Sequence, residues 1–181
     1  VSVAVDGGAR GENIGDIVTT GDLNGDGRDE IISANETVDS VSIVSFDEDG
    51  ISSRVDLAVG DTPLVVRVVD LNADGNLDLI TANFGSGNVS VLIGTGNGSF
   101  APSVQFAAGP NPQSLAVADF DGNGTLDVAV SSATSGNLQM LFGNGMGDLS
   151  APTVVSVAGV SSGEDLEFGD FDGDGDVDLA V

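Results

Sequence analysis

A nine-residue acidic segment recurs four times along the chain, and this recurrence constrains the fold more than any other feature of the sequence. The four copies, called loop 1 to loop 4, span residues 22–30, 70–78, 119–127 and 170–178. Their starts lie 48, 49 and 51 residues apart. A period of this length is typical of architectures in which each repeat is one supersecondary unit that buries its faces against its neighbours. We therefore expect one repeat domain over residues 1–181, with approximate repeats 12–60, 61–109, 110–159 and an incomplete 160–181.

The second repeat shows the local structure most clearly. Turn residues separate four short runs that are rich in apolar and β-branched residues. These runs are Leu64–Val69, Leu77–Ala82, Val89–Ile93 and Phe100–Ala107. Four strands about every 50 residues match the blade of a β-propeller. The sequence predicts an all-β fold, a β-propeller or part of one, made of four-stranded antiparallel blades with about four repeats visible.

The N-terminal residues carry a related pattern. Residues 1–6 resemble the apolar run before loop 4, so we expect them to form the outer strand of a preceding or closing blade. No basic region followed by an apolar stretch is present, and we read Val1 as an internal or processed start.

The acidic segments have the composition of a cation site. Side-chain oxygens at positions 1, 3, 5 and 9, with the backbone carbonyl at position 7, can converge on one point, and an all-oxygen cage suits Ca²⁺. Glycine at position 6 of every loop permits the sharp reversal that such a cage requires. We predict about four calcium ions per chain. The predicted ligands are Asp22, Asn24, Asp26, Arg28, Glu30, Asp70, Asn72, Asp74, Asn76, Asp78, Asp119, Asp121, Asn123, Thr125, Asp127, Asp170, Asp172, Asp174, Asp176 and Asp178.

Other metal sites fit the sequence less well. An EF-hand requires a bidentate Glu at position 12, where this chain has Ser33, Thr81, Val130 and Val181. Zinc and copper sites favour His or Cys, and the chain contains neither. Magnesium tends to retain water instead of filling an all-protein cage. A single Asp-Gly-rich segment can be a simple polar turn, but four copies in register argue against that reading.

The charge balance supports bound cations. The chain has 29 acidic residues and only four basic ones, all Arg, and its formal net charge is −25. Fifteen of the 29 acidic residues lie within the four loops, so four calcium ions would bring the net charge to −17. Such an acidic chain excludes nucleic acid as a partner, because phosphate binding requires basic patches. The abundant Val, Ile, Leu and Phe argue against disorder, and no apolar run is long enough to cross a membrane.

The loops, with Phe84-Gly85 and Gly109-Pro110 between them, resemble the FG-GAP/VCBS repeats of integrin α-subunit propellers. The resemblance covers nearly the whole chain. It implies a propeller, commonly of seven blades, in which calcium loops join the first and second strands of a blade. Two departures, Glu30 at position 9 and Asn123 at position 5, are expected to weaken their sites. With four repeats, three readings stay open: part of a longer protein, self-association of copies into a ring, or repeats that stack without closing.

The resemblance implies structural calcium sites in a secreted or cell-surface module for protein interaction or adhesion, contacting its partner through loops opposite the ions. One alternative is a lectin-type propeller for glycans, although the chain lacks Trp and Tyr, the usual stacking surfaces for sugars. We expect Phe100, Phe106, Phe120 and Phe171 to lie in the core. The other alternative is a non-catalytic propeller in a secreted polysaccharide-active enzyme.

Catalysis by this chain itself is not expected. His, Cys, Lys and Tyr are all missing, which leaves only carboxylates and Ser as general bases or nucleophiles. Glu164, Asp165 and Glu167 could form a glycosidase-like pair, but adjacent acids before an acidic loop more often form a solvated run. The sequence thus predicts a scaffold and leaves the partner open.

Overall fold

A computed structural model of the chain describes residues 18–157 and 165–181, and these contain fourteen strands and no helix. The predicted strand at residues 1–6 lies outside the described residues. The strands are β1 (Val18–Gly21), β2 (Glu30–Asn35), β3 (Ser40–Asp47), β4 (Gly50–Ala58), β5 (Pro63–Val69), β6 (Asp78–Asn83), β7 (Asn88–Leu92), β8 (Val104–Ala107), β9 (Pro112–Ala118), β10 (Asp127–Ser132), β11 (Ser135–Leu141), β12 (Thr153–Ser156), β13 (Glu167–Gly169) and β14 (Asp178–Ala180).

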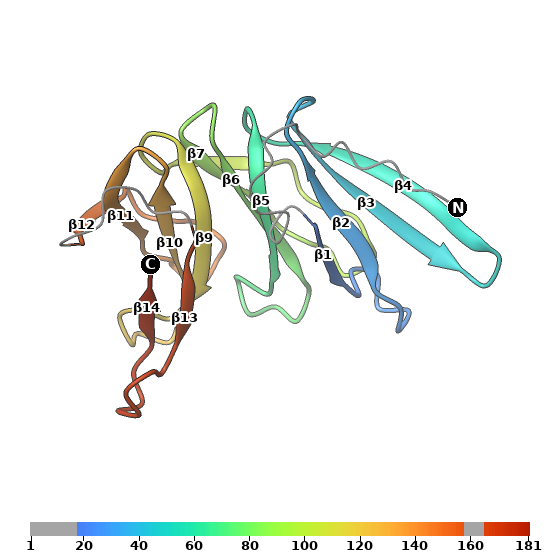
Figure 1. Cartoon of the computed structure of the whole chain (residues 1–181). Coiled ribbons are helices and arrows are strands. Elements are labelled where there is room, and N and C mark those ends of the chain that lie inside the picture. Colours follow the sequence, from blue (N-terminus) through green and yellow to red (C-terminus); the bar gives the residue numbers. More distant parts are fainter. Residues whose placement is uncertain (1–17, 158–164) are drawn as a thin grey trace.

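The strands form three four-stranded antiparallel sheets in the orders β1-β2-β3-β4, β5-β6-β7-β8 and β9-β10-β11-β12, and a two-stranded sheet of β13 and β14. Each sheet is a meander in which consecutive strands pair. The sheets stand side by side in an open arc (Figure 1). The first strands β1, β5, β9 and β13 contact one another in succession, whereas β4, β8 and β12 end each sheet on its other edge. The prediction of an all-β fold with propeller-type blades is confirmed.

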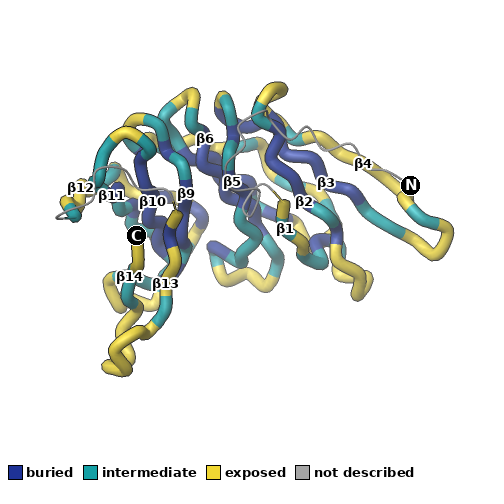
Figure 2. Tube along the Cα trace, in the orientation of Figure 1, coloured by how far each residue is buried: buried dark blue, intermediate teal, exposed yellow. Residues whose placement is uncertain are grey.

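The second strand of each complete sheet is buried on both faces, so its polar residues as well as its apolar residues lie inside the protein. In β6, Leu79 packs in a cluster with Ile32 of the first sheet, while its neighbour Ile80 packs with Leu115 of the third. Successive side chains of a strand point to opposite faces, so one strand supplies both inter-sheet cores. Figure 2 shows the same gradient, with buried central strands and an exposed β4.

Two sequence predictions, one about a strand boundary and one about a core residue, are wrong. The fourth strand of the second repeat begins at Val104 and not at Phe100, which makes only an isolated bridge with Gly94. Pro102 lies between them and cannot donate to a strand ladder. Phe171 is 63% exposed instead of buried, because it lies in loop 4 beside the two-stranded sheet, where no third described strand covers it. Phe100, Phe106 and Phe120 do pack against the core clusters, as expected.

The Phe84-Gly85 dipeptide marks a close contact between strand connections. The amide of Gly85 donates to the carbonyl of Asp61 over 3.0 Å, and the amide of Phe84 donates to the carbonyl of Thr62 over 2.9 Å. A methyl group at Gly60 would lie 2.5 Å from both Ser86 Oγ and Asn88 Oδ1, so no larger residue fits there. These glycines are therefore required by close approach between the connection into a blade and the turn between its second and third strands.

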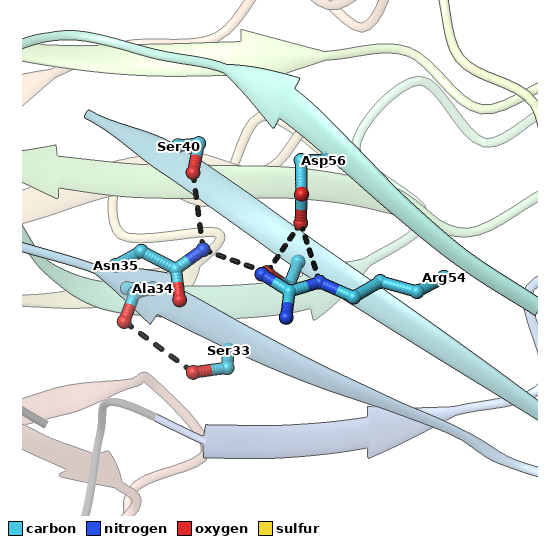
Figure 3. Close-up of polar contacts among 7 residues, drawn as sticks. Ser33, Ala34, Asn35, Ser40, Arg54 and Asp56 are labelled. Carbon is cyan, nitrogen blue, oxygen red and sulfur yellow. Dashed lines mark hydrogen bonds and ion pairs between the residues drawn. The ribbon is translucent and has the colours of Figure 1, made fainter. Parts of the chain in front are cut away.

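A buried amide lies at the same end of the first sheet (Figure 3). Asn35 Nδ2 donates to the hydroxyls of Ser40 over 3.0 Å and Ser42 over 2.7 Å. The Ser42 hydroxyl donates in turn to Asp56 Oδ1, which also accepts from Arg54 Nε. These bonds, the Ser42 bond above all, hold the pKa of Asp56 below its ordinary value. In the second sheet Asn83 Nδ2 makes matching bonds, so this buried amide is satisfied within its own blade in both of the first two sheets.

The two-sided burial of β6 gives a direct test. Replacing Leu79 or Ile80 with Ala should each lower the free energy of unfolding by about 2–5 kcal/mol, since each leaves a cavity in a different inter-sheet core. Val104→Ala, at a side chain that is 51% exposed, should change it by less than about 0.5 kcal/mol. Urea denaturation measures all three. A tolerated Leu79→Ala or Ile80→Ala would contradict the packing of one strand against two neighbouring sheets.

Candidate metal-binding loops

All four acidic loops join the first strand of a sheet to the second, and they lie along the same, lower edge of the arc (Figure 1). Loop 1 follows β1, loop 2 follows β5, loop 3 follows β9 and loop 4 follows β13. The position-9 residue of each loop is also the first residue of the following strand. The strand ladder therefore fixes the position-9 residue, and positions 1 to 8 form a loop that projects beyond the sheet.

The carboxylate at position 1 organises each loop. In loop 2, Asp70 Oδ1 accepts the amide of Asp74 over 3.1 Å, and Asp70 Oδ2 accepts the amide of Gly75 over 2.9 Å. Gly75 has a φ of +88°, a left-handed conformation that glycine adopts without strain. Equivalent bonds to the amides of positions 5 and 6 occur in the other loops, at Asp22, Asp119 and Asp170.

Positions 3 and 5 continue the same pattern with short turns. Asn72 Oδ1 accepts the amide of Asp74 over 3.1 Å, and Asp74 Oδ1 accepts the amide of Asn76 over 2.8 Å. The corresponding pairs of bonds recur in all four loops. An oxygen that accepts one amide retains lone-pair capacity for a cation, so these bonds shape the loop without using up its ligands.

The carboxylate at position 9 closes each loop. Asp78 is fully buried, and its two oxygens accept the amides of Leu71 over 2.9 Å and Gly94 over 2.7 Å. Asp127 makes the same pair of bonds with Phe120 and Gly143. Asp78 and Asp127 therefore each tie their own loop to the turn between the third and fourth strands of the same sheet.

Loops 1 and 4 close in related ways. Glu30 is 2% exposed, and its carboxylate accepts the amide of Leu23 over 2.8 Å and Asn24 Nδ2 over 2.7 Å. The longer side chain of Glu thus reaches a loop side chain in addition to the position-2 amide. In loop 4, Asp178 accepts the amide of Phe171 over 2.9 Å.

Burial and hydrogen bonding act in opposite directions on these acids. Burial raises the pKa of Asp78 above its ordinary value, against the lowering effect of the Gly94 and Leu71 amides, and Asp74 and Asp70 raise it further. Without a cation, ionisation of Asp78 therefore lowers the free energy of unfolding, and this loss of stability grows as the pH rises through the folded-state pKa of Asp78. The pKa values of Asp22 and Asp74 are shifted in the opposite direction, below their ordinary value. The largest cause is the hydrogen bond from the Gly27 amide for Asp22 and from the Asn76 amide for Asp74.

Two of the loops bring three carboxylates within reach of a single ion. One oxygen from each member of the group lies within 4.8 Å of the others in Asp119, Asp121 and Asp127, and likewise in Asp170, Asp172 and Asp174. The donors are all oxygen, which is the chemistry that Ca²⁺ prefers. Loops 1 and 2 have Asn24 and Asn72 at position 3, so an amide oxygen stands in place of the third acid. The residues fit a hard divalent cation.

The sequence predicts that position 7 contributes a ligand only through its backbone carbonyl, and the side chains at this position make other contacts. The Arg28 guanidinium approaches the carboxylate of Glu48, in the turn of the β3–β4 hairpin, at 3.9 Å, and both side chains are exposed. Thr125 Oγ1 contacts the carbonyl of Gly143 at 3.1 Å. Gly94 and Gly143 were not singled out as site residues by sequence reasoning, although each opens a Gly-x-Gly-x-Gly turn that begins 16 residues after the closing acid.

An FG-GAP-like repeat profile matches residues 22–81, 70–130 and 130–181, which together include all four loops. The chain belongs to the FG-GAP-like repeat family. This confirms the resemblance on which the sequence reading relied, at the level of the repeat. No curated protein matches the sequence of this FG-GAP-like chain.

Two solved structures are similar to the FG-GAP-like chain in fold. A chain of the Photorhabdus luminescens Tc holotoxin pore is 19% identical, with a TM-score of 0.56 over 90% of this chain and 8% of that one. BBS1N, in a complex with ARL6DN that was soaked with lead, is 16% identical, with a TM-score of 0.59 over 85% of this chain and 46% of that one. The FG-GAP-like chain thus spans less than half the length of either. At these identities the matches show the fold alone, and they fit part of a β-propeller.

The closing carboxylate can be tested without metal. Asp78→Asn should lower the free energy of unfolding in chelator by about 1–3 kcal/mol, because an amide has one acceptor oxygen for two buried amide donors. Asp29→Asn, at the exposed position 8 of loop 1, is the control and should cost less than about 0.5 kcal/mol. Urea denaturation of both variants decides the matter. Equal stability of Asp78→Asn and the unchanged chain would show that Asp78 does not hold the loop closed.

Proposed function

We propose that the chain is a calcium-stabilised β-propeller module that mediates protein interaction or adhesion outside the cell, with structural calcium sites. The observation that carries the proposal is the recurrence of one closed, oxygen-lined loop in every repeat of an FG-GAP-like chain. Loops with a shared construction at one edge of the blades are suited to stiffening the scaffold, and leave the opposite connections for a partner.

Calcium supplies positive charge at the points where the chain concentrates its acids. Side chains at positions 1, 3, 5 and 9 of each loop would hold the ions. Position 1 is Asp22, Asp70, Asp119 or Asp170, position 3 is Asn24, Asn72, Asp121 or Asp172, position 5 is Asp26, Asp74, Asn123 or Asp174, and position 9 is the closing acid. Loops 3 and 4 border one hollow of about 290 Å³ lined by Asp119, Asp121 and Asp176, so their charges also repel between repeats. Neutralising these acids lowers the free energy of the folded state relative to the unfolded chain, in which they separate.

The repeat family and the composition of the chain support an extracellular location and a binding role. FG-GAP repeats are typical of extracellular proteins, where calcium is present at millimolar concentration and a moderate site is occupied. None of the described residues forms a helix that could span a membrane. The chain has no His, Cys, Lys or Tyr, so a binding role is favoured over catalysis. No described feature specifically favours a glycan ligand.

Calcium should raise the thermal stability strongly. Each occupied loop at a calcium concentration of 100 times its Kd adds about 2.7 kcal/mol, so the melting temperature should rise in steps with the number of ions bound. Calorimetry with calcium and with chelator, together with elemental analysis of the dialysed protein, measures the shift and the stoichiometry, which we expect to be about four per chain. Equal melting temperatures and no retained calcium would overturn the calcium sites.

The partner class requires a separate measurement. The immobilised chain, exposed to extracellular proteins in millimolar calcium, should retain proteins that a chelator releases, because loss of calcium loosens the scaffold that presents the binding surface. The matched control is a chain with Asp74→Ala and Asp174→Ala, which should retain less. Binding on a glycan array in place of protein retention would replace the proposal with the lectin alternative.

A further inference from the structure

The turn Gly94–Gly98 touches the acidic loops of two successive repeats. At its start, the amide of Gly94 donates to Asp78 Oδ1, the closing carboxylate of loop 2, over 2.7 Å. At its end, the amide of Gly98 donates to the carbonyl of Leu23, in loop 1, over 2.9 Å. The turn that joins the third and fourth strands of the second sheet therefore spans the boundary between two candidate calcium sites.

The contact in loop 1 leads directly to that loop's own closing acid. The amide of Leu23 donates to Glu30 Oε2 over 2.8 Å, while its carbonyl receives the Gly98 amide. An unbroken series of hydrogen bonds and peptide units thus joins Glu30 of loop 1 to Asp78 of loop 2. A displacement of either carboxylate on binding a cation moves a peptide group that the turn holds.

The turn is rigid enough to transmit such a displacement. The amide and the hydroxyl of Thr95 both donate to the carbonyl of Ser99, over 3.0 and 2.9 Å. Asn97 Oδ1 accepts the Ser99 amide over 3.0 Å. A methyl group at Gly96 would overlap Asn76 Oδ1 of loop 2, so the turn is also pressed against the loop at position 7.

The next boundary is built differently. Gly143 donates to Asp127 as Gly94 does to Asp78, but a methyl group at Gly147 would meet the Ile93 side chain. Among residues 18–157, no hydrogen bond from Gly147 to loop 2 matches the one from Gly98 to Leu23. Of these two described boundaries, the one between loops 1 and 2 has the polar connection, and the turn Gly143–Gly147, called the blade-3 turn, offers a natural comparison.

We propose that the turn Gly94–Gly98 positions both Asp78 and the Leu23 peptide, so that calcium binding at loop 2 strengthens calcium binding at loop 1. This inference rests on the proposed function, since it requires calcium in both loops. A cation at loop 2 fixes Asp78, and the rigid turn then holds the Leu23 peptide in the arrangement that loop 1 presents to its own cation, which gives positive coupling. Direct repulsion between two bound cations has the opposite sign, so the direction of the effect separates the two causes.

The test is a calcium titration of the ¹⁵N-labelled full chain at 0.15 M salt (about the physiological value), followed by NMR at the amides of Gly27 and Gly75. These amides bind the position-1 acids of loops 1 and 2. Asp74→Ala should weaken loop 1 about fivefold or more, and Asp26→Ala should weaken loop 2 by the same factor, because coupling is reciprocal. The second variant measures the same coupling independently of the first.

A second pair of variants assigns the coupling to the turn. In a Thr95→Ala background the effect of Asp74→Ala on loop 1 should fall below about twofold, whereas Asn144→Ala, at the matching position of the blade-3 turn, should leave it unchanged. Loop 1 affinity that is unchanged or higher in Asp74→Ala, with calcium still bound, overturns the coupling alone. No movement of either amide up to about 10 mM calcium, well above the Kd of extracellular sites, overturns the coupling together with the calcium proposal.

Discussion

The buried carboxylate that closes the acidic loop of each complete blade is the interaction on which the rest of the structure depends. Asp78 and Asp127 each start the second strand of a blade, and each binds one amide from its own loop and one from a distant turn. An ionised carboxylate without these donors could not stay buried. The same group therefore begins a strand, shapes a loop and fixes a turn, which is why the repeat requires an acid at that position.

Packing between blades is a consequence of the same repeated geometry. Once each loop fixes the start of a second strand, the alternating side chains of that strand reach both neighbouring sheets, as Leu79 and Ile80 do. Each blade buries its faces only through its neighbours, so the stability of the array is distributed along the chain. Phe171, in the loop beside the two-stranded last sheet, is exposed because no described neighbouring strand covers it.

Buried polar groups are hydrogen-bonded in different ways at the two ends of a blade. At the end opposite the loops, neutral side chains such as Asn83 and Ser90 satisfy one another and the buried main chain. At the loop end, carboxylates meet the amides but leave a surplus of negative charge. That surplus is the physical reason to expect calcium at the loop end.

The sequence by itself determined the repeat, the four-stranded unit and the acidic loops, because a fixed period, alternating apolar runs and Asp-Gly spacing are local properties of the chain. It also supported the family, which rests on the same local motifs. It misjudged the start of β8, where Pro102 interrupts the ladder, and the burial of Phe171, which depends on what a neighbouring strand covers. Only the tertiary structure showed that Gly94 and Gly98 link Asp78 to Leu23. That connection joins residues from two repeats, and hydrogen bonds between distant segments leave no periodic mark in a sequence.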